Sequence, residues 1–167
     1  MAKQVDFSPA PLIGDPVKFW VSRYTNKAID WHIEDVNPHL KSYLSIFQKE
    51  KKDPQKIFIP LCGKTKDIPY LLSLGFEVFG VEGVAQAVEQ LDAENNLGLK
   101  FDPVDSVYGT EDGKLKVFCG DLFKCPIEKW GPFDCVWDRG SFIAIDYSYR
   151  ELYSELLKRS VVQTGDH

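Results

Sequence analysis

The chain has 167 residues, of which 44% are hydrophobic and 27% charged, and its formal net charge is −5 at pH 7. This composition is typical of a globular protein and excludes a wholly disordered chain, and the length fits a single domain. The acidic balance argues against a nucleic-acid-binding surface. We expect no membrane span, because no apolar stretch approaches ~18 residues, and no signal peptide, because the N-terminus lacks an apolar core.

The cysteines indicate a reducing environment. They are Cys62, Cys119, Cys125 and Cys135. None forms a C-x-x-C pair and three lie in or beside apolar runs, which predicts free thiols in a cytoplasmic protein. The three histidines show no metal-ligand spacing with these cysteines, so no metal is expected.

Two helices are predicted first, after a proline-rich loop that reaches about Asp15. Asp15-Pro16 and Asn37-Pro38 each combine an N-cap residue with proline at the first helical position. The first helix passes through 19–21. The second places apolar residues at i, i+3, i+4 and i+7, namely Leu40, Tyr43, Leu44 and Phe47.

Strands and helices alternate in the rest of the chain. Short apolar runs predict strands at 57–59, 77–81, 115–119 and 134–137, and amphipathic patterns predict helices at 64–74, 84–91 and 149–157. The segment 101–113 is rich in turn residues and is predicted to be a surface excursion. This alternation predicts an α/β fold with a doubly wound parallel sheet and helices on both faces.

Candidate binding residues follow the first three strands. Ligands of such sheets bind at the carboxyl ends of the strands. Gly63 allows a sharp turn close to a ligand, although the full G-x-G-x-x-G and Walker A motifs are absent. Glu82 follows 19 residues later, at the position of a carboxylate that accepts hydrogen bonds from ribose. Asp121 and Leu122 come after the third strand, where they would meet the amino group and the ring of adenine.

Each of these residues also has a structural interpretation. Gly63 fits a simple turn, Glu82 a helix cap before Val84, and Asp121 an ordinary N-cap. Taken together, the three strand ends indicate an adenosine-containing ligand without a pyrophosphate.

The fourth strand is followed by Asp138 and Arg139. One interpretation is an arginine presented to an anionic group of a substrate. The other is a structural salt bridge between the two residues.

Several motifs resemble the thiopurine S-methyltransferases, a branch of the class I S-adenosylmethionine-dependent methyltransferases. The segments that carry the resemblance are 59–64 (IPLCGK), 80–83 (GVEG), 119–123 (CGDLF), 131–134 (GPFD) and 137–140 (WDRG), with Trp20-x-x-Arg23-Tyr24 and Trp31-His32 upstream. The combination of the motif at 59–64 with the motif at 137–140 is distinctive. The resemblance extends from about Val17 to Ser160.

The resemblance implies a Rossmann-like sheet in one methyltransferase domain, with 1–52 as a helical cap over the cofactor and 53–167 as the core. It implies S-adenosylmethionine as cofactor and a small aromatic or heterocyclic thiol as substrate, and we expect a monomer. The implied cofactor-binding residues are Trp20, Tyr24, Trp31, Leu61, Gly63, Glu82, Asp121, Leu122 and Arg139. Trp31 and Arg139 would also face the substrate, and Arg139 would be catalytic. Trp20 and Trp31 could face the sulfonium of the cofactor as cation–π partners. The alternative is that both tryptophans only cap the core.

The chain departs from the family in two places. The family usually has glycine a few residues after the position of Tyr24, whereas this chain has Asn26-Lys27-Ala28, so the loop is expected to follow a different path. A class I sheet has seven strands and only four are predicted here. We therefore expect a sheet without its last strands and with an exposed fourth strand.

Two other functions are also compatible with the sequence. One is a catalytically inactive, truncated isoform, or a cofactor-binding or regulatory fragment of such an enzyme. The other is a nucleotide-dependent oxidoreductase, which the missing glycines of the dinucleotide motif disfavour.

Overall fold

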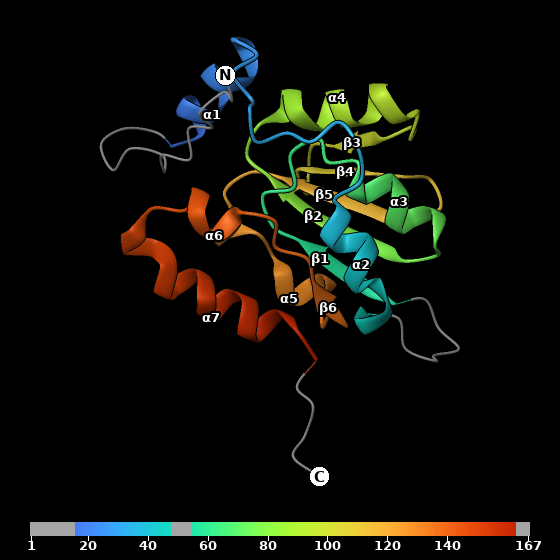
Figure 1. Cartoon of the computed structure of the whole chain (residues 1–167). Helices are drawn as coiled ribbons and strands as arrows, with labels where there is room; N and C mark the ends of the chain where they lie inside the picture. Colours follow the sequence, from blue (N-terminus) through green and yellow to red (C-terminus); the bar gives the residue numbers. More distant parts are fainter. Residues whose placement is uncertain (1–15, 48–54, 163–167) are drawn as a thin grey trace.

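The structure, a computed structural model, describes residues 16–47 and 55–162 (Figure 1). The predicted loop before Asp15 lies outside these residues. The elements in chain order are α1 (Pro16–Thr25), α2 (Pro38–Phe47), β1 (Lys56–Ile59), α3 (Asp67–Ser73), β2 (Glu77–Glu82), α4 (Ala85–Asn95), β3 (Lys100–Asp102), β4 (Val107–Gly109), β5 (Leu115–Cys119), the 3₁₀ turn η1 (Leu122–Lys124), α5 (Ile127–Trp130), β6 (Cys135–Val136), α6 (Ser141–Ala144), the 3₁₀ turn η2 (Tyr147–Tyr149) and α7 (Arg150–Ser160).

The strands form one six-stranded sheet in the order β3-β4-β5-β2-β1-β6. The four strands β5, β2, β1 and β6 are parallel, as predicted. From β1 the chain proceeds to β2 and β5 on one side and then returns to place β6 on the other side. The strand order therefore reverses between β1 and β6, which is where doubly wound sheets bind ligands.

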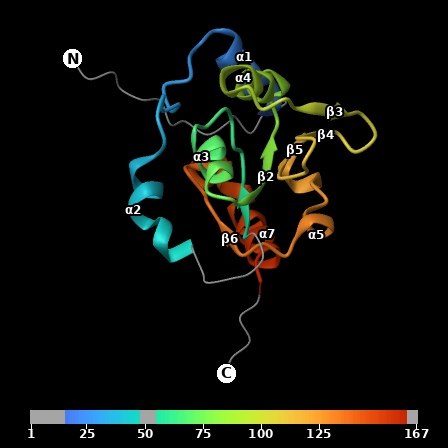
Figure 2. The ribbon, with the colours of Figure 1, turned by 90° about the vertical axis from the view of Figure 1, so that its right-hand side faces the viewer.

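Helices cover both faces of the sheet (Figure 2). Helices α2, α3 and α4 pack on one face, against a core that includes Ile57, Ile59 and Val78. Helices α5 and α7 pack on the other face, against a core that includes Phe58 and Phe79. Successive side chains of a strand point to opposite faces, so a strand buried on both sides needs an unbroken apolar run. This is why β1 carries three apolar residues in succession.

Several predicted elements differ from the structure. The segment 101–113 is not only a surface excursion, because β3 and β4 form an antiparallel hairpin that extends the sheet past β5. Helix α3 begins at Asp67, three residues later than the predicted 64. Tyr43 is 55% exposed rather than part of the buried face of α2. The short helices α5 and α6 were not predicted, because four residues are too few to show a helical period.

The C-terminal part of the described chain pairs with the sheet, which the sequence did not suggest. Val161 forms a parallel bridge with Phe133, the residue two positions before β6. The N–H of Phe133 donates to the carbonyl of Ser160 at 2.8 Å, and the N–H of Val162 donates to the carbonyl of Phe133 at 2.9 Å. The edge beside β6 is therefore paired at Phe133, just before the strand, rather than wholly exposed as the sequence predicted.

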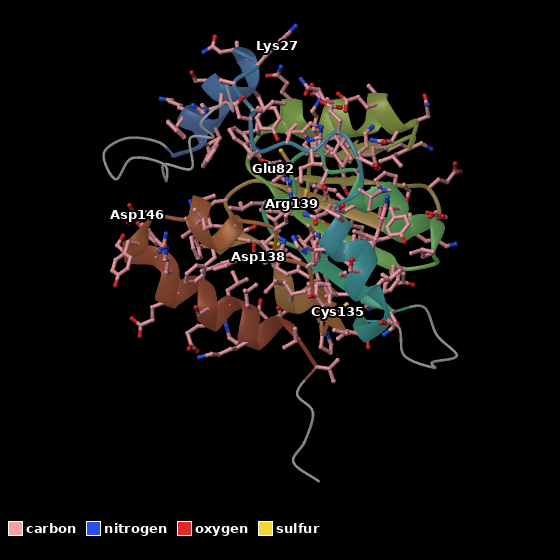
Figure 3. The ribbon with its side chains drawn as sticks, in the orientation of Figure 1. Lys27, Glu82, Cys135, Asp138, Arg139 and Asp146 are labelled. Carbon is pink, nitrogen blue, oxygen red and sulfur yellow. The ribbon has the colours of Figure 1, made fainter. Side chains whose placement is uncertain are left out.

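The stretch 26–28, where the resembling family usually has glycine, turns through a left-handed residue. Lys27 has φ of 55°, a conformation that glycine adopts most readily. Its N–H donates to the carbonyl of Tyr24 at 3.1 Å, which closes the end of α1. A lysine thus occupies a turn conformation that favours glycine (Lys27 is labelled in Figure 3).

Candidate functional site

A cleft of about 1000 Å³ opens at the carboxyl ends of β1, β2, β5 and β6. All nine residues predicted for the site line it: Trp20, Tyr24, Trp31, Leu61, Gly63, Glu82, Asp121, Leu122 and Arg139. Figure 3 shows Glu82 and Arg139 near the middle of the molecule, below α4. A cleft of this size can hold a nucleoside-sized ligand together with a second small molecule. The structure thus brings the nine residues together, and their individual roles remain predictions.

Glu82 is the most heavily hydrogen-bonded side chain of the cleft. Its Oε2 accepts from the N–H of Gly63 at 2.8 Å, its Oε1 accepts from the N–H of Val84 at 2.9 Å, and the N–H of Gly83 also acts on the same carboxylate. Burial raises the pKa of this carboxyl group, and the three N–H donors oppose the rise. A carboxylate has about four acceptor positions, so it can still accept a hydroxyl hydrogen from a ligand. The bond to Val84, the N-cap residue of α4, also gives Glu82 a structural role at the start of that helix, so its structural and binding interpretations are compatible.

Gly63 and Tyr24 pack closely beside this carboxylate. Gly63 has φ of +55°, and a Cβ atom added to it would lie 2.8 Å from the hydroxyl oxygen of Tyr24. Burial, followed by the negative charge of Glu82, raises the pKa of Tyr24, so its phenol stays protonated. Leu61, with φ of 42°, also has a left-handed conformation in this turn. The loop after β1 therefore needs a residue without a side chain at position 63.

We expect Gly63→Ala to lower both stability and ligand affinity, with Gly75→Ala as the matched control. Gly75 has φ of +88° and no atom within 4 Å of an added Cβ. Both variants should lose about 1 kcal/mol of unfolding free energy because alanine disfavours positive φ. Only Gly63→Ala should also weaken binding of S-adenosylhomocysteine, the product of the cofactor that the resemblance implies, by roughly tenfold, because the hydroxyl of Tyr24 must shift.

Chemical denaturation and calorimetric titration would measure these two effects. Equal ligand affinity in the two variants would show that the close packing of Gly63 and Tyr24 does not shape the ligand site.

Aromatic side chains from the N-terminal segment cover one side of the cleft. Trp20 and Trp31 meet edge to face with ring centroids 5.3 Å apart, and Tyr24 meets Trp31 at 6.2 Å. These residues also pack on Val84, at the start of α4. The guanidinium of Arg23 lies 5.3 Å from the centroid of the Trp31 ring. The tryptophans therefore line the cleft and cap the core at the same time.

Arg139 connects the end of β6 to this N-terminal segment. Its Nη1 donates a hydrogen bond to the main-chain carbonyl of Trp31 at 3.0 Å. Asp138 does not pair with Arg139, because its carboxylate accepts from the N–H of Ser141 and from the hydroxyl of Tyr153. The salt-bridge interpretation of this pair is therefore wrong, and the guanidinium remains available to the cleft.

Asp121 and Leu122 form the end of the cleft beside β5. The Oδ1 of Asp121 accepts from the N–H of Phe123 at 2.9 Å and so caps the turn η1, which is the structural role considered above. Asp121 is exposed, whereas Leu122 is buried. The second carboxylate oxygen of Asp121 lies 4.0 Å from the Nζ of Lys124 and keeps the capacity to accept a hydrogen bond from a ligand.

The sequence did not indicate a second wall of the cleft, made by α6 and η2. Its residues include Ile143, Ala144, Ile145, Ser148 and Tyr149. The ring of Tyr149 stacks on Phe123 with centroids 5.6 Å apart. This wall gives the cleft an apolar, aromatic side near Arg139. The available signal was weak: Asp146 caps η2 by accepting from the N–H and hydroxyl of Ser148, a common local turn.

The sequence also did not single out Asp67, a carboxylate that is only 1% exposed. It accepts from the N–H of Asn37 at 2.7 Å and from the indole N–H of Trp137 at 2.8 Å. One buried side chain thus joins the segment before α2 to the end of β6.

None of the helices in the described ranges is long and apolar enough to cross a membrane. Among the same residues, no group of three or more histidine, cysteine or acidic side chains is arranged to hold a metal ion.

Comparison with known proteins identifies the family. The family model described as "Thiopurine S-methyltransferase (TPMT)" matches residues 16–167. The chain is 31% identical over 143 residues to thiopurine S-methyltransferase of Bos taurus, covering 83% of this chain and 58% of that protein. It is 32% identical over 136 residues to the enzyme of that name from Pseudomonas aeruginosa (strain LESB58), covering 81% of this chain and 62% of that protein. The chain thus spans about three fifths of the length of these relatives.

A solved structure shares the fold. It is described as "DhpI-SAM-HEP complex" and matches with a TM-score of 0.53 and 15% identity, over 89% of this chain and 60% of that chain. The doubly wound, Rossmann-like fold predicted from the sequence is therefore confirmed. Together with the match of the family model to residues 16–167, these findings place the chain in the thiopurine S-methyltransferase family.

Proposed function

We propose that this cleft binds S-adenosylmethionine and supports transfer of its methyl group to the sulfur of a small aromatic or heterocyclic thiol, in a cytoplasmic monomer. The observation that carries the proposal is Glu82, a buried carboxylate at the end of β2 that accepts from the N–H groups of Gly63 and Val84. This is the position from which such folds bind ribose hydroxyls. Both the relatives' names and the fold support the choice of reaction class.

The residues of the cleft fit the parts of this cofactor. Glu82 would accept from the ribose hydroxyls, Asp121 from the adenine amino group, and Leu122 would contact the adenine ring. The left-handed turn at Leu61 and Gly63 would let the main chain approach the methionine end. Trp20 and Trp31 offer aromatic rings to the sulfonium, an interaction of roughly 0.5–2 kcal/mol.

The acceptor would lie between Arg139 and the apolar wall of α6 and η2. S-adenosylmethionine supplies an activated methyl group, so the chain needs to supply alignment and a favourable charge. In the transfer, the thiol loses its proton to solvent, a sulfur–carbon bond forms at the acceptor, and the bonding pair of the broken bond stays with S-adenosylhomocysteine. The guanidinium of Arg139 favours the thiolate over the thiol, because a nearby cation lowers a thiol pKa.

The experiment is a thermal unfolding measurement with and without S-adenosylhomocysteine, followed by an assay of thiophenol methylation by mass spectrometry. A ligand at ~100 times its dissociation constant should stabilise the protein by ~2.7 kcal/mol. Stabilisation together with formation of methyl phenyl sulfide would support the proposal. Stabilisation without turnover on any of a panel of aromatic and heterocyclic thiols would favour a cofactor-binding fragment instead. Stabilisation by NADH alone would favour an oxidoreductase.

A further inference from the structure

A chain of hydrogen bonds holds the residues on either side of Arg139 in the sequence. The hydroxyl of Tyr153, on α7, donates to the Oδ2 of Asp138 at 2.8 Å. The Oδ1 of Asp138 accepts from the N–H of Ser141 at 2.7 Å, and the hydroxyl of Ser141 donates to the carbonyl of Pro60 at 2.7 Å. The residues immediately around Arg139 are therefore tied to α7 on one side and to the loop after β1 on the other (Figure 3 labels Asp138 and Arg139).

This part of the chain depends on such bonds because it belongs to no strand or helix. Strand β6 ends at Val136 and α6 begins at Ser141. The last sheet-like bond on this side is from the N–H of Trp137 to the carbonyl of Phe58 at 2.9 Å. Gly140 then turns with φ of 91°. Between these points the main chain that carries Arg139 is held chiefly by the carboxylate of Asp138.

Tyr153 is well suited to hold that carboxylate. It is fully buried and lies outside the set of described residues that line the cleft, so it does not itself meet a ligand there. Burial, followed by the charge of Asp138, raises the pKa of Tyr153, and the phenol therefore remains a donor at neutral pH. A hydrogen bond to a charged acceptor away from water is stronger than one at the surface.

We propose that Tyr153 is a positioning residue for Arg139: its hydroxyl fixes Asp138, and with it the turn that directs the guanidinium into the cleft and onto the carbonyl of Trp31. The inference rests on the proposed function for its effect on catalysis. Its structural part, the coupling from α7 to the segment around Trp31, stands independently of the reaction.

The first test is a double-mutant cycle of Tyr153→Phe and Arg139→Ala. Tyr153→Phe alone should lower kcat/KM for thiophenol about tenfold, within the loss that a misplacement of about 1 Å can cause. The dissociation constant of S-adenosylhomocysteine should stay within about twofold. In the Arg139→Ala background, Tyr153→Phe should have no further effect, because a residue that acts through Arg139 has nothing left to position. Additive losses would overturn the proposal.

The second test measures hydrogen exchange in residues 29–33, without reference to activity. Tyr153→Phe should speed exchange there several-fold, because the bond from Arg139 to Trp31 loosens. Ile68→Val is the control: it removes a methyl group from a fully buried site in the other core, so it lowers stability without touching this network. The control should leave both exchange at 29–33 and kcat/KM unchanged.

The two tests separate the failure of this inference from that of the proposed function. Unchanged exchange at 29–33 in Tyr153→Phe, or equal acceleration in Ile68→Val, overturns the positioning role even in an active enzyme. Accelerated exchange confined to Tyr153→Phe supports the positioning role even if the chain transfers no methyl group.

Discussion

Replacing Arg139 with alanine should lower kcat/KM for a thiol acceptor by about 100-fold, because removing one preorganised charge from an active site commonly costs about 10²- to 10³-fold. The affinity for S-adenosylhomocysteine should fall by no more than about threefold, since Glu82, Asp121 and the loop after β1 remain in place. The side chain lines the cleft and is linked to the N-terminal segment by one bond, from its Nη1 to the carbonyl of Trp31.

The pH dependence of the residual activity is a second readout of the same variant. If the guanidinium lowers the pKa of the bound thiol, the wild-type enzyme has its acceptor as thiolate at lower pH than the variant does. The rise of kcat/KM with pH should therefore shift to higher pH in Arg139→Ala. Arg139→Lys keeps the charge but lacks the planar fork, so it should lose less activity and show a smaller shift.

The matched control is Arg159→Ala, which removes an exposed arginine paired with Glu128 at 3.0 Å. It should leave kcat/KM unchanged, because exposed ion pairs contribute little and this one is on α7 and α5. If Arg139→Ala weakens S-adenosylhomocysteine binding as much as it lowers kcat/KM, Arg139 serves the cofactor and the proposed acceptor role is wrong.

The parallel part of the fold was predictable because its local signals agree with its tertiary environment. Strand β1 is an apolar run covered on both faces, and α4 has its apolar residues on one side. The hairpin β3–β4 was not predictable in this way. Each strand has three residues, and β3 is entirely exposed, so neither shows a buried face. Its position is set by antiparallel pairing with β5, the next strand along the chain, and not by a buried face of its own.

The site was partly predictable for a similar reason. The strand-end rule placed Gly63, Glu82 and Arg139 at one edge of the sheet, and they do line one cleft. The sequence could not decide whether Glu82 has a structural role before α4 or a binding role, because the same carboxylate accepts from the N–H of Val84 and also lines the cleft. It could not reveal Asp67 or Tyr153 either, since their partners are set by the fold. The bond between Asp67 and Trp137, for example, spans 70 positions.

Glu82→Gln should weaken S-adenosylhomocysteine binding by about 30-fold, equivalent to about 2 kcal/mol, because hydrogen bonds to a charged group are worth ≈ 1.5–3 kcal/mol. The wild-type carboxylate accepts from the N–H groups of Gly63 and Val84 and keeps acceptor capacity for ribose. Glutamine has one acceptor oxygen, and its NH₂ group would face an N–H donor. The variant therefore loses acceptors on both the protein side and the ligand side.

The exposed Glu89, also near the start of α4, provides the control. Glu89→Gln makes the same change of charge without touching the carboxylate in the cleft. Calorimetric titration should give it the wild-type affinity. Wild-type affinity in Glu82→Gln as well would contradict the ribose assignment, and equal weakening in both variants would indicate a general charge effect.

The pH dependence of binding should identify the same carboxylate. Burial raises the pKa of Glu82 in the folded, ligand-free protein above its ordinary value of 4.5. The protonated side chain therefore contributes to stability at pH values below 4.5, and this contribution is lost as the pH rises through the raised pKa. Ribose hydroxyls donate to the ionised form, so ligand binding favours ionisation. The stabilisation by S-adenosylhomocysteine should therefore increase as pH rises through the raised pKa. Thermal unfolding with and without ligand should show this increase in the wild type and Glu89→Gln but not in Glu82→Gln, and a similar increase in all three would assign it to another group.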